Sequence, residues 1–228
     1  NLDSVMKRRH TPRINNSDTR TLEVDTQFQN FFTTYHDKLT VINVERANRA
    51  MTPFSTFKIP NSIIALEEKI IESKNSPLTY NQENYPVEAW WPSVWKLPKY
   101  DLSTAYKFSM VAIYRELATK IGKEKMQSYL KRFDYGNRDI SSGLDNFWLN
   151  GSIKISALEQ VEFLKKFHSN TFAKDVNISE STQNIMKEVM LAQDLGDTKI
   201  YAKTGAGKVD DGTMLGWYVG YVESPKGT

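Results

Sequence analysis

Apolar residues recur every three or four positions in several long segments of the chain, the spacing that gathers them on one face of an α-helix. After Ser55 this stripe includes Ile63, Leu66 and Ile70. The same spacing, with capping and glycine signals at its ends, predicts four more helices. They cover residues 101–121, the segment around 126–133, residues 156–167 and residues 181–193.

Short runs of aromatic and β-branched residues near both ends of the chain predict strands. Residues 28–35 and 39–44 indicate a hairpin around a polar turn, and residues 199–203 and 216–222 indicate a second hairpin. The order of strands, helices and strands favours an α+β fold in which a helical block is inserted into an antiparallel sheet.

A chain of 228 residues is long enough for one domain or a pair of interlocked subdomains. We expect a polar N-terminal tail over residues 1–24 and a single domain over residues 25–228. Residues 28–44 and 198–223 would form its antiparallel sheet, flanked by helices. Residues from about 75 to 170 would form a mostly helical subdomain.

Charge and composition argue against several classes of function. The net charge of +3 is small and the charged residues are scattered, which argues against a nucleic-acid surface. No apolar run is long enough to cross a membrane. The absence of cysteine excludes disulfides, thiol catalysis and cysteine-ligated metals. The three histidines are far apart in sequence, so we expect no metal site and no serine–histidine pair.

Candidate chemistry begins at Ser55 and Lys58, which share one helix face because they are three residues apart. A serine nucleophile needs a neighbouring base, and a lysine can serve only if burial discharges its ammonium. Phe54, Phe57 and Ile59 supply apolar surroundings. The structural alternative is a capping serine beside a lysine whose head reaches water. The chain contains three other Ser-x-x-Lys matches, so the spacing alone does not decide between these interpretations.

Further motifs follow, and each has an ordinary structural interpretation when it is taken alone. Ser109-Met110-Val111 lies in a helical region, and Tyr135-Gly136-Asn137 indicates a turn. Phe147-Trp148-Leu149 lies in a loop, and Lys203-Thr204-Gly205 ends a predicted strand. A proline-rich loop also carries a tryptophan cluster that includes Trp95, which would form a satellite core or line a ligand site.

Together, in this order, the motifs resemble the class D β-lactamases, the oxacillinase-type serine enzymes. The resemblance extends from about residue 28 to residue 223 and includes Ser55-Thr56-Phe57-Lys58 as its first motif. It implies the fold of serine β-lactamases and penicillin-binding proteins, and hydrolysis of a small-molecule β-lactam. It also implies a location in the periplasm or outside the cell, and no cofactor other than carbon dioxide. The sequence does not indicate an oligomeric state.

The resemblance assigns Ser55 as the nucleophile and Lys58, N-carboxylated by carbon dioxide, as the general base. An apolar pocket favours this modification, because it lowers the pKa of the lysine and only the neutral amine captures carbon dioxide. Val111, Trp148 and Leu149 would form the wall around the carbamate, with the Trp148 indole N–H as its hydrogen-bond donor.

The remaining motif residues would act on the substrate. Ser109, with Lys203 beside it, would pass a proton to the leaving nitrogen. The backbone N–H groups of Ser55 and Ala206 would form the oxyanion hole. The other residues expected to bind substrate are Thr204, through the substrate carboxylate, and Gly205 and Trp95.

Some positions depart from the common family pattern. Phe54 stands where a small residue is usual, Ala112 replaces a proline, and Ala206 replaces an aromatic residue. The family also continues beyond residues 216–222 with another strand, a helix and an arginine that binds the substrate carboxylate. We therefore expect this chain to be a fragment of a longer enzyme.

Three alternatives remain open. A β-lactam sensor domain would be acylated without turnover, although Val111 and Trp148 match the hydrolytic enzymes. A cell-wall transpeptidase or carboxypeptidase usually has Ser-x-Asn where this chain has Ser109-Met110-Val111. An inert truncated homologue is suggested only by the expected loss of the C-terminal segment.

Overall fold

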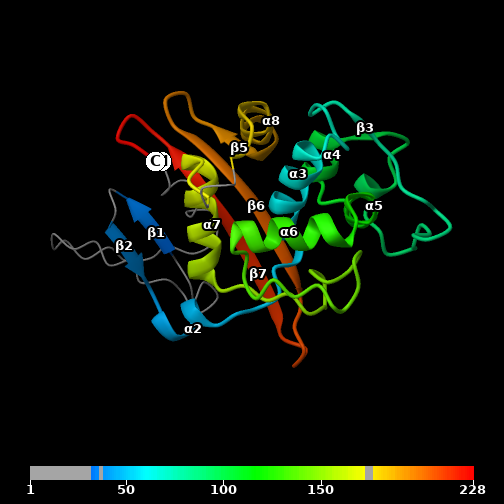
Figure 1. The fold of residues 1–228 in the computed structure, drawn as a ribbon, viewed down its shortest axis with the longest axis horizontal. Coiled ribbons are helices and arrows are strands. Elements are labelled where there is room, and N and C mark those ends of the chain that lie inside the picture. Colours follow the sequence, from blue (N-terminus) through cyan, green and yellow to red (C-terminus); the bar gives the residue numbers. More distant parts are fainter. Residues whose placement is uncertain (1–31, 36–37, 173–176) are drawn as a thin grey trace.

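The structure is a computed structural model that describes residues 32–35, 38–172 and 177–228. Helices α7 (Ala157–Ser169) and α8 (Glu180–Met190) contact a long β-hairpin, and a shorter hairpin also lies beside α7 (Figure 1). The predicted N-terminal tail and residues 28–31 of the first predicted strand lie outside the described residues.

Three antiparallel sheets are present among the described residues. Their strands are β1 (Phe32–Tyr35), β2 (Lys38–Val41), β3 (Pro77–Leu78), β4 (Tyr100–Asp101), β5 (Leu191–Asp194), β6 (Lys199–Lys208) and β7 (Met214–Glu223). β1 pairs with β2, β3 pairs with β4, and the third sheet has the order β5-β6-β7. Both predicted hairpins are present over their described residues, but the strand predicted over residues 39–44 ends at Val41, and Val44 begins helix α2 (Val44–Asn48). The two hairpins belong to separate hydrogen-bonded sheets instead of the single sheet that we expected.

The described helices and 3₁₀ turns are α2 (Val44–Asn48), η1 (Phe54–Phe57), α3 (Lys58–Glu67), η2 (Ser93–Trp95), α4 (Leu102–Lys107), α5 (Val111–Ile121), α6 (Lys123–Phe133), α7 (Ala157–Ser169) and α8 (Glu180–Met190).

The single helix predicted over residues 101–121 is wrong. Ser109 adopts a left-handed conformation with φ of 58°, which ends α4 and starts α5 in a new direction. The helix predicted over residues 181–193 ends at Met190, because the next residues pair with the edge of β6 as strand β5.

Helix α3 forms the centre of the core. Every residue from Lys58 to Leu66 is buried, so this helix is covered on all sides. Of the predicted apolar stripe, Ile63 and Leu66 belong to α3, whereas Ile70 lies beyond its end at Glu67. Two polar side chains of α3 bond to α5, whereas Asn61 Oδ1 has no partner among the described residues. Asn61 Nδ2 donates to the carbonyl oxygen of Tyr114 at 3.2 Å, and the hydroxyls of Ser62 and Tyr114 lie 2.9 Å apart. Such pairing offsets the cost of burying polar groups.

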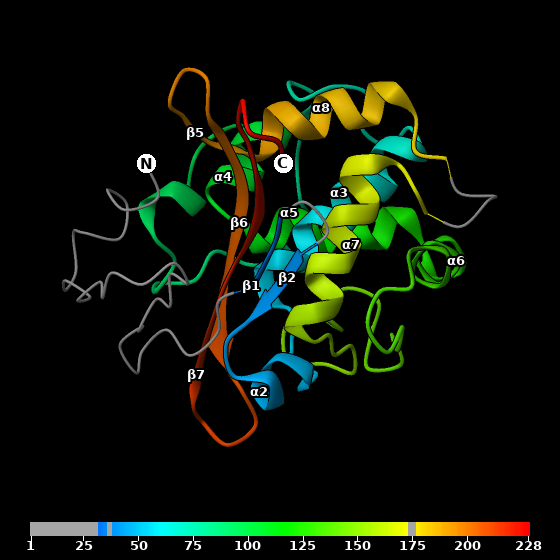
Figure 2. The same ribbon diagram turned by 90° about the vertical axis from the view of Figure 1, so that its left-hand side faces the viewer.

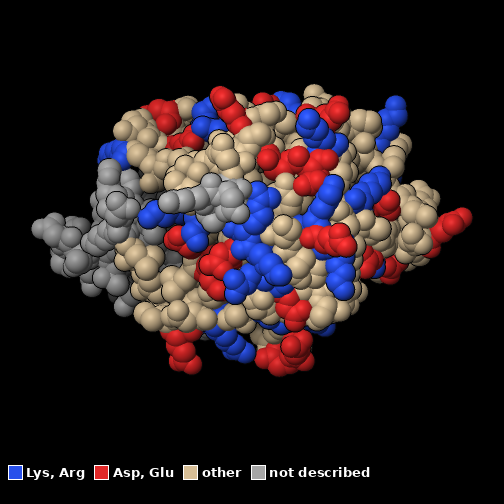
Figure 3. Space-filling view, in the orientation of Figure 1, with Lys and Arg blue, Asp and Glu red and all other residues tan. Residues whose placement is uncertain are grey.

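The long β6–β7 hairpin passes beside this core. In Figure 2 it runs from top to bottom, with α3 and α7 on its right-hand side. No helix among the described residues has the length and apolar character needed to cross a membrane. Basic and acidic side chains are interspersed over the face drawn in Figure 3, in keeping with the scattered charges of the sequence.

Candidate active site

Ser55 and Lys58 lie at the junction of η1 and α3. The 3₁₀ turn places them on one side of the chain, and Lys58 Nζ lies 3.0 Å from Ser55 Oγ. Lys58 has no exposed surface, whereas Ser55 is half-buried. Pro60 falls within the first turn of α3, as predicted from its missing N–H. The alternative of a lysine that reaches water is therefore wrong.

Burial and a second lysine act on the charge of Lys58. Desolvation lowers the pKa of Lys58 well below its ordinary value, and the positive charge of Lys203 lowers it further. The Tyr114 ring, whose centroid lies 4.9 Å from Lys58 Nζ, is the aromatic wall nearest to this ammonium in the described contacts. A neutral lysine beside a serine hydroxyl is a general base.

Lys203 enters the site from β6. It is 5% exposed, and its Nζ donates to the Thr204 carbonyl oxygen at 2.9 Å and lies 3.5 Å from Thr204 Oγ1. The Tyr106 ring of α4 lies under it, with the centroid 5.6 Å from Nζ. Burial lowers the pKa of Lys203 to about 8. Most Lys203 side chains therefore carry a proton at neutral pH.

Several buried polar side-chain atoms have no hydrogen-bond partner among the described residues. Two of them belong to predicted site residues, the Ser109 hydroxyl and the Trp148 indole N–H, and a third is the Tyr106 hydroxyl. The Trp148 ring stacks on Phe57, with centroids 5.2 Å apart and an interplanar angle of 18°, and Phe57 directly precedes Lys58. A buried unpaired N–H is costly unless a ligand or a modified side chain accepts from it. The Trp148 N–H is therefore a donor without an acceptor in a side chain that stacks on the residue before Lys58.

Strand β6 approaches the η1 turn closely at a glycine. A Cβ atom on Gly205 would lie only 3.0 Å from the Pro53 carbonyl oxygen and 3.1 Å from the Thr56 nitrogen. The absence of a side chain at Gly205 thus lets β6 pack against η1. The neighbours Thr204 and Ala206 remain exposed, on the opposite face of the strand from Gly205.

The other predicted residues have the following local positions in the structure. Val111 is the first residue of α5, directly after the turn that holds Ser109. Leu149 follows Trp148 and packs partly buried against the core. Trp95 Nε1 donates to the Phe108 carbonyl oxygen at 2.7 Å, so this side chain supports the Ser109 turn. Its role as a substrate contact stays a prediction.

Sequence reasoning missed several residues that shape the site. Gln160 of α7 donates through Nε2 to Thr56 Oγ1 at 2.8 Å, and Trp217 of β7 donates through Nε1 to the Thr52 carbonyl oxygen at 2.8 Å. Tyr106 and Tyr114 provide the rings beside the two lysines. Tyr106 and Tyr114 lie within three residues of the Ser109-Met110-Val111 motif, whereas Gln160 and Trp217 lie farther from the motifs. All four residue types are common in ordinary cores, so nothing in the local sequence distinguishes them.

Comparisons with known proteins agree with this geometry. A family model described as the penicillin binding protein transpeptidase domain matches residues 16–228. The crystal structure of FUS-1 (OXA-85), a class D β-lactamase from Fusobacterium nucleatum subsp. polymorphum, matches with a TM-score of 0.75 and 33% sequence identity. The match covers 83% of this chain and 75% of that chain. The chain belongs to the class D β-lactamase family. Its fold is the transpeptidase-like α+β fold expected from the motifs.

Two curated relatives, a β-lactamase and a regulatory protein, are also similar to this chain. β-Lactamase OXA-48 of Klebsiella pneumoniae is 41% identical over 182 residues, which cover 79% of this chain and 64% of that protein. The chain thus spans slightly less than two thirds of that relative. The regulatory protein BlaR1 of Bacillus licheniformis is 32% identical over 86% of this chain and 31% of its own length.

Proposed function

We propose that this class D family member hydrolyses β-lactams through an acyl-enzyme on Ser55, with Lys58 as general base. The observation that carries the proposal is the 3.0 Å separation of Lys58 Nζ and Ser55 Oγ, combined with complete burial of Lys58. The lowered pKa of Lys58 makes an uncharged, proton-accepting form accessible. The family resemblance also implies that the activity is located in the periplasm or outside the cell.

Two backbone N–H groups are the candidates for stabilising the oxyanion. When Ser55 Oγ adds to the β-lactam carbonyl carbon, negative charge develops on the carbonyl oxygen. The Ser55 N–H lies in the 3₁₀ turn, and the Ala206 N–H lies on the strand that Gly205 brings against that turn. Because the donor is a backbone N–H, the replacement of an aromatic residue by Ala206 leaves it available to the oxyanion. The small alanine side chain also leaves more room beside the substrate.

The β-lactam nitrogen must receive a proton when its bond to the carbonyl carbon breaks. The Ser109 hydroxyl is buried without an acceptor, and Lys203 carries an ammonium with a pKa of about 8. We assign to Ser109 the transfer of this proton to the nitrogen. Lys203 would then return a proton to Ser109. The exposed Thr204 hydroxyl, 3.5 Å from Lys203 Nζ, would bind the substrate carboxylate with help from this ammonium.

Lys58 is also suited to N-carboxylation. The carbamate would supply an anionic oxygen base for acylation and for activation of the deacylating water. The unpaired Trp148 N–H would donate to it, and Val111 and Leu149 would help to exclude solvent from the pocket. No group of histidine, aspartate and glutamate side chains that could hold a metal is found among the described residues.

A β-lactam sensor is the second candidate, and the similarity to the regulatory protein BlaR1 favours it. A sensor would use the same Ser55 chemistry but would keep the acyl group. A cell-wall peptidase is less well supported, because the chain has Val111 where those enzymes usually have asparagine. Turnover separates the two main candidates.

The test is hydrolysis of a chromogenic cephalosporin by the full chain, with and without added bicarbonate. We expect sustained turnover that bicarbonate enhances. Trp148→Phe should retain the stack on Phe57 but lose about 10- to 100-fold in turnover and need more bicarbonate. Trp90→Phe, at a side chain that is 65% exposed, is the control and should behave as wild type. A single stoichiometric burst would favour the sensor, and the absence of both burst and turnover would overturn the proposal.

A further inference from the structure

Phe54, the residue before the nucleophile, has an unusual backbone conformation. Its φ is +48°, in the left-handed region that bulky side chains rarely adopt. The side chain is 4% exposed and belongs to a small apolar cluster with Ala157, Leu215 and Trp217. Strained residues of this kind persist only when their surroundings hold them in place.

The surroundings that hold Phe54 include Gly207 of β6. A Cβ atom on Gly207 would lie 2.2 Å from Phe54 Cε1 and 2.6 Å from Cδ1, so the ring occupies the space that a side chain would need. Gly205, two residues earlier, makes the equivalent close approach to Thr56 and Pro53. Ala206 thus lies between two glycines that are both packed against the nucleophile turn.

We propose that the Phe54 ring, seated on Gly207, sets the distance between the backbone N–H groups of Ser55 and Ala206. Phe54 is then a positioning residue for the oxyanion hole. The inference rests on the proposed function, because it assumes that these two groups bind an oxyanion.

The geometry of the peptide unit supports this role. The Ser55 N–H belongs to the planar peptide that joins Phe54 to Ser55, so the φ,ψ conformation at Phe54 directly orients this donor. The Ala206 N–H belongs to the peptide that joins Gly205 to Ala206, and Gly207 follows directly on the next peptide. A brace between Phe54 and Gly207 therefore connects the chain segments that carry both donors. Oxyanion donors act at about 2.7–3.1 Å, and displacement by about 1 Å can cost about 100-fold in rate.

The test is a double-mutant cycle at these two positions in the full chain. Gly207→Ala inserts a methyl group into the ring, and Phe54→Ala removes the ring. The combined variant restores space for that methyl group. Gly216→Ala is the matched control, because Gly216 lies opposite Ala206 on β7 and a Cβ atom there meets nothing within 4 Å. Thermal unfolding identifies any variant that is not folded.

The readout is binding of an aryl boronic acid, measured by fluorescence, together with the acylation rate constant for a penicillin. In the boronic acid adduct the Ser55 oxygen bonds to boron, its proton passes to the base, and a boron-bound oxygen occupies the oxyanion hole. Gly207→Ala should weaken boronic acid binding and slow acylation by about 10- to 100-fold. Phe54→Ala should lose about 10-fold in both, and the double variant should be no worse than Phe54→Ala. The control should stay within about twofold of wild type.

If the effects of the two substitutions are independent and multiply in the double variant, the proposal that Phe54 and Gly207 act together is contradicted. The proposal is also contradicted if Gly207→Ala or Phe54→Ala binds the boronic acid and is acylated as wild type is. If Gly207→Ala does not fold, Phe54→Ala and the double variant carry the comparison. A wild-type chain that neither binds the boronic acid nor is acylated would overturn the proposed function itself, and the brace with it.

Discussion

The burial of Lys58 lowers both the pKa of its side chain and the stability of the fold. Its ammonium would be completely buried, and the nearest positive charge acting on it is Lys203. Because the folded state lowers the pKa of Lys58, the unfolded chain binds more protons between that lowered value and about 10.4. The burial of Lys58 therefore costs stability at neutral pH, and stability rises with pH over this interval.

The substitution Lys58→Met should stabilise the fold and abolish turnover. In buffer free of carbon dioxide we expect a gain of about 1–2 kcal/mol in the free energy of unfolding at pH 7, shrinking towards pH 10. Denaturant unfolding at both pH values measures it. Lys123→Met, at an exposed position, should change stability by less than about 0.5 kcal/mol. A destabilised Lys58→Met variant would contradict the prediction.

Lys203 should set the alkaline limb of the activity profile. Its pKa is lowered to about 8 by burial, so its ammonium is lost as the pH rises through this value. Because the proposed mechanism uses the protonated form, kcat/KM should fall above about pH 8. Lys203→Arg should reduce the maximal rate but move this limb upward, since arginine keeps its charge. If the fall of kcat/KM at alkaline pH is unchanged in Lys203→Arg, a group other than Lys203 causes it.

At the scale of elements, η1 is held from three directions. β6 packs on it through Gly205, α7 reaches it through Gln160, and β7 reaches the preceding residues through Trp217. Gln160 is 2% exposed and donates to Thr56 Oγ1, which itself donates to the Pro53 carbonyl oxygen at 2.7 Å. The turn that carries Ser55 is thus fixed by elements that are distant in sequence.

Gln160→Leu should loosen this turn. The loss of a buried hydrogen bond should cost about 1–2 kcal/mol of unfolding free energy, measured in urea, and should lower kcat more than it raises KM. Glu162→Gln, on an exposed part of the same helix, serves as control and should change stability by less than about 0.5 kcal/mol. Equal effects of the two substitutions would show that the Gln160 contact does not support η1.

Local patterns predicted most elements but not where helices break. The capping box at Ser156 and the apolar stripe after Ser55 gave α7 and α3, because these signals are local. The α4–α5 break at Ser109 escaped, since serine carries no turn signal comparable to glycine and its left-handed φ is imposed by packing. The pairing of Lys58 with Ser55 could be predicted only from the spacing together with the other motifs, whereas the contact from Gln160 depends on the tertiary fold.

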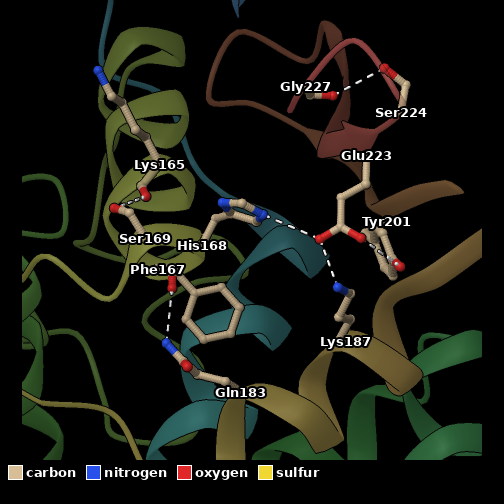
Figure 4. A network of polar contacts seen from close by, with 10 residues as sticks. All are labelled: Lys165, Phe167, His168, Ser169, Gln183, Lys187, Tyr201, Glu223, Ser224 and Gly227. Atoms are coloured by element: carbon tan, nitrogen blue, oxygen red, sulfur yellow. Dashed lines mark hydrogen bonds and ion pairs between the residues drawn. The ribbon is translucent and has the colours of Figure 1, made fainter. Parts of the chain in front are cut away.

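At the scale of the whole molecule, Glu223 at the end of β7 connects three other elements. Figure 4 shows it between His168 of α7, Lys187 of α8 and Tyr201 of β6. Lys187 Nζ lies 2.8 Å from Glu223 Oε1, His168 Nε2 lies 3.3 Å from the same oxygen, and Tyr201 donates to Oε2 at 3.2 Å. Partial burial acts to raise the pKa of Glu223, but the hydrogen bonds from Lys187 and His168 outweigh it and lower this pKa.

Glu223→Gln should weaken the docking of these elements. Because folding lowers the pKa of Glu223, its contribution is present above about pH 4.3 and is lost as the pH falls through the folded value. We expect a loss of about 1 kcal/mol at pH 7, given its partial exposure, and a much smaller difference near pH 3. Glu188→Gln, in the exposed pair with Lys74, is the control and should cost less. A loss that does not depend on pH would contradict the prediction.

The identity of the acylated residue tests the central claim most directly. A penicillin is mixed with the full chain, the reaction is quenched within the first turnovers, and peptides are mapped by mass spectrometry. We predict one adduct, on the peptide that contains Ser55, which disappears as the substrate is consumed and is absent from Ser55→Ala. An adduct on another residue, or none while wild type still turns over substrate, would contradict the assignment of Ser55 and Lys58 as nucleophile and base.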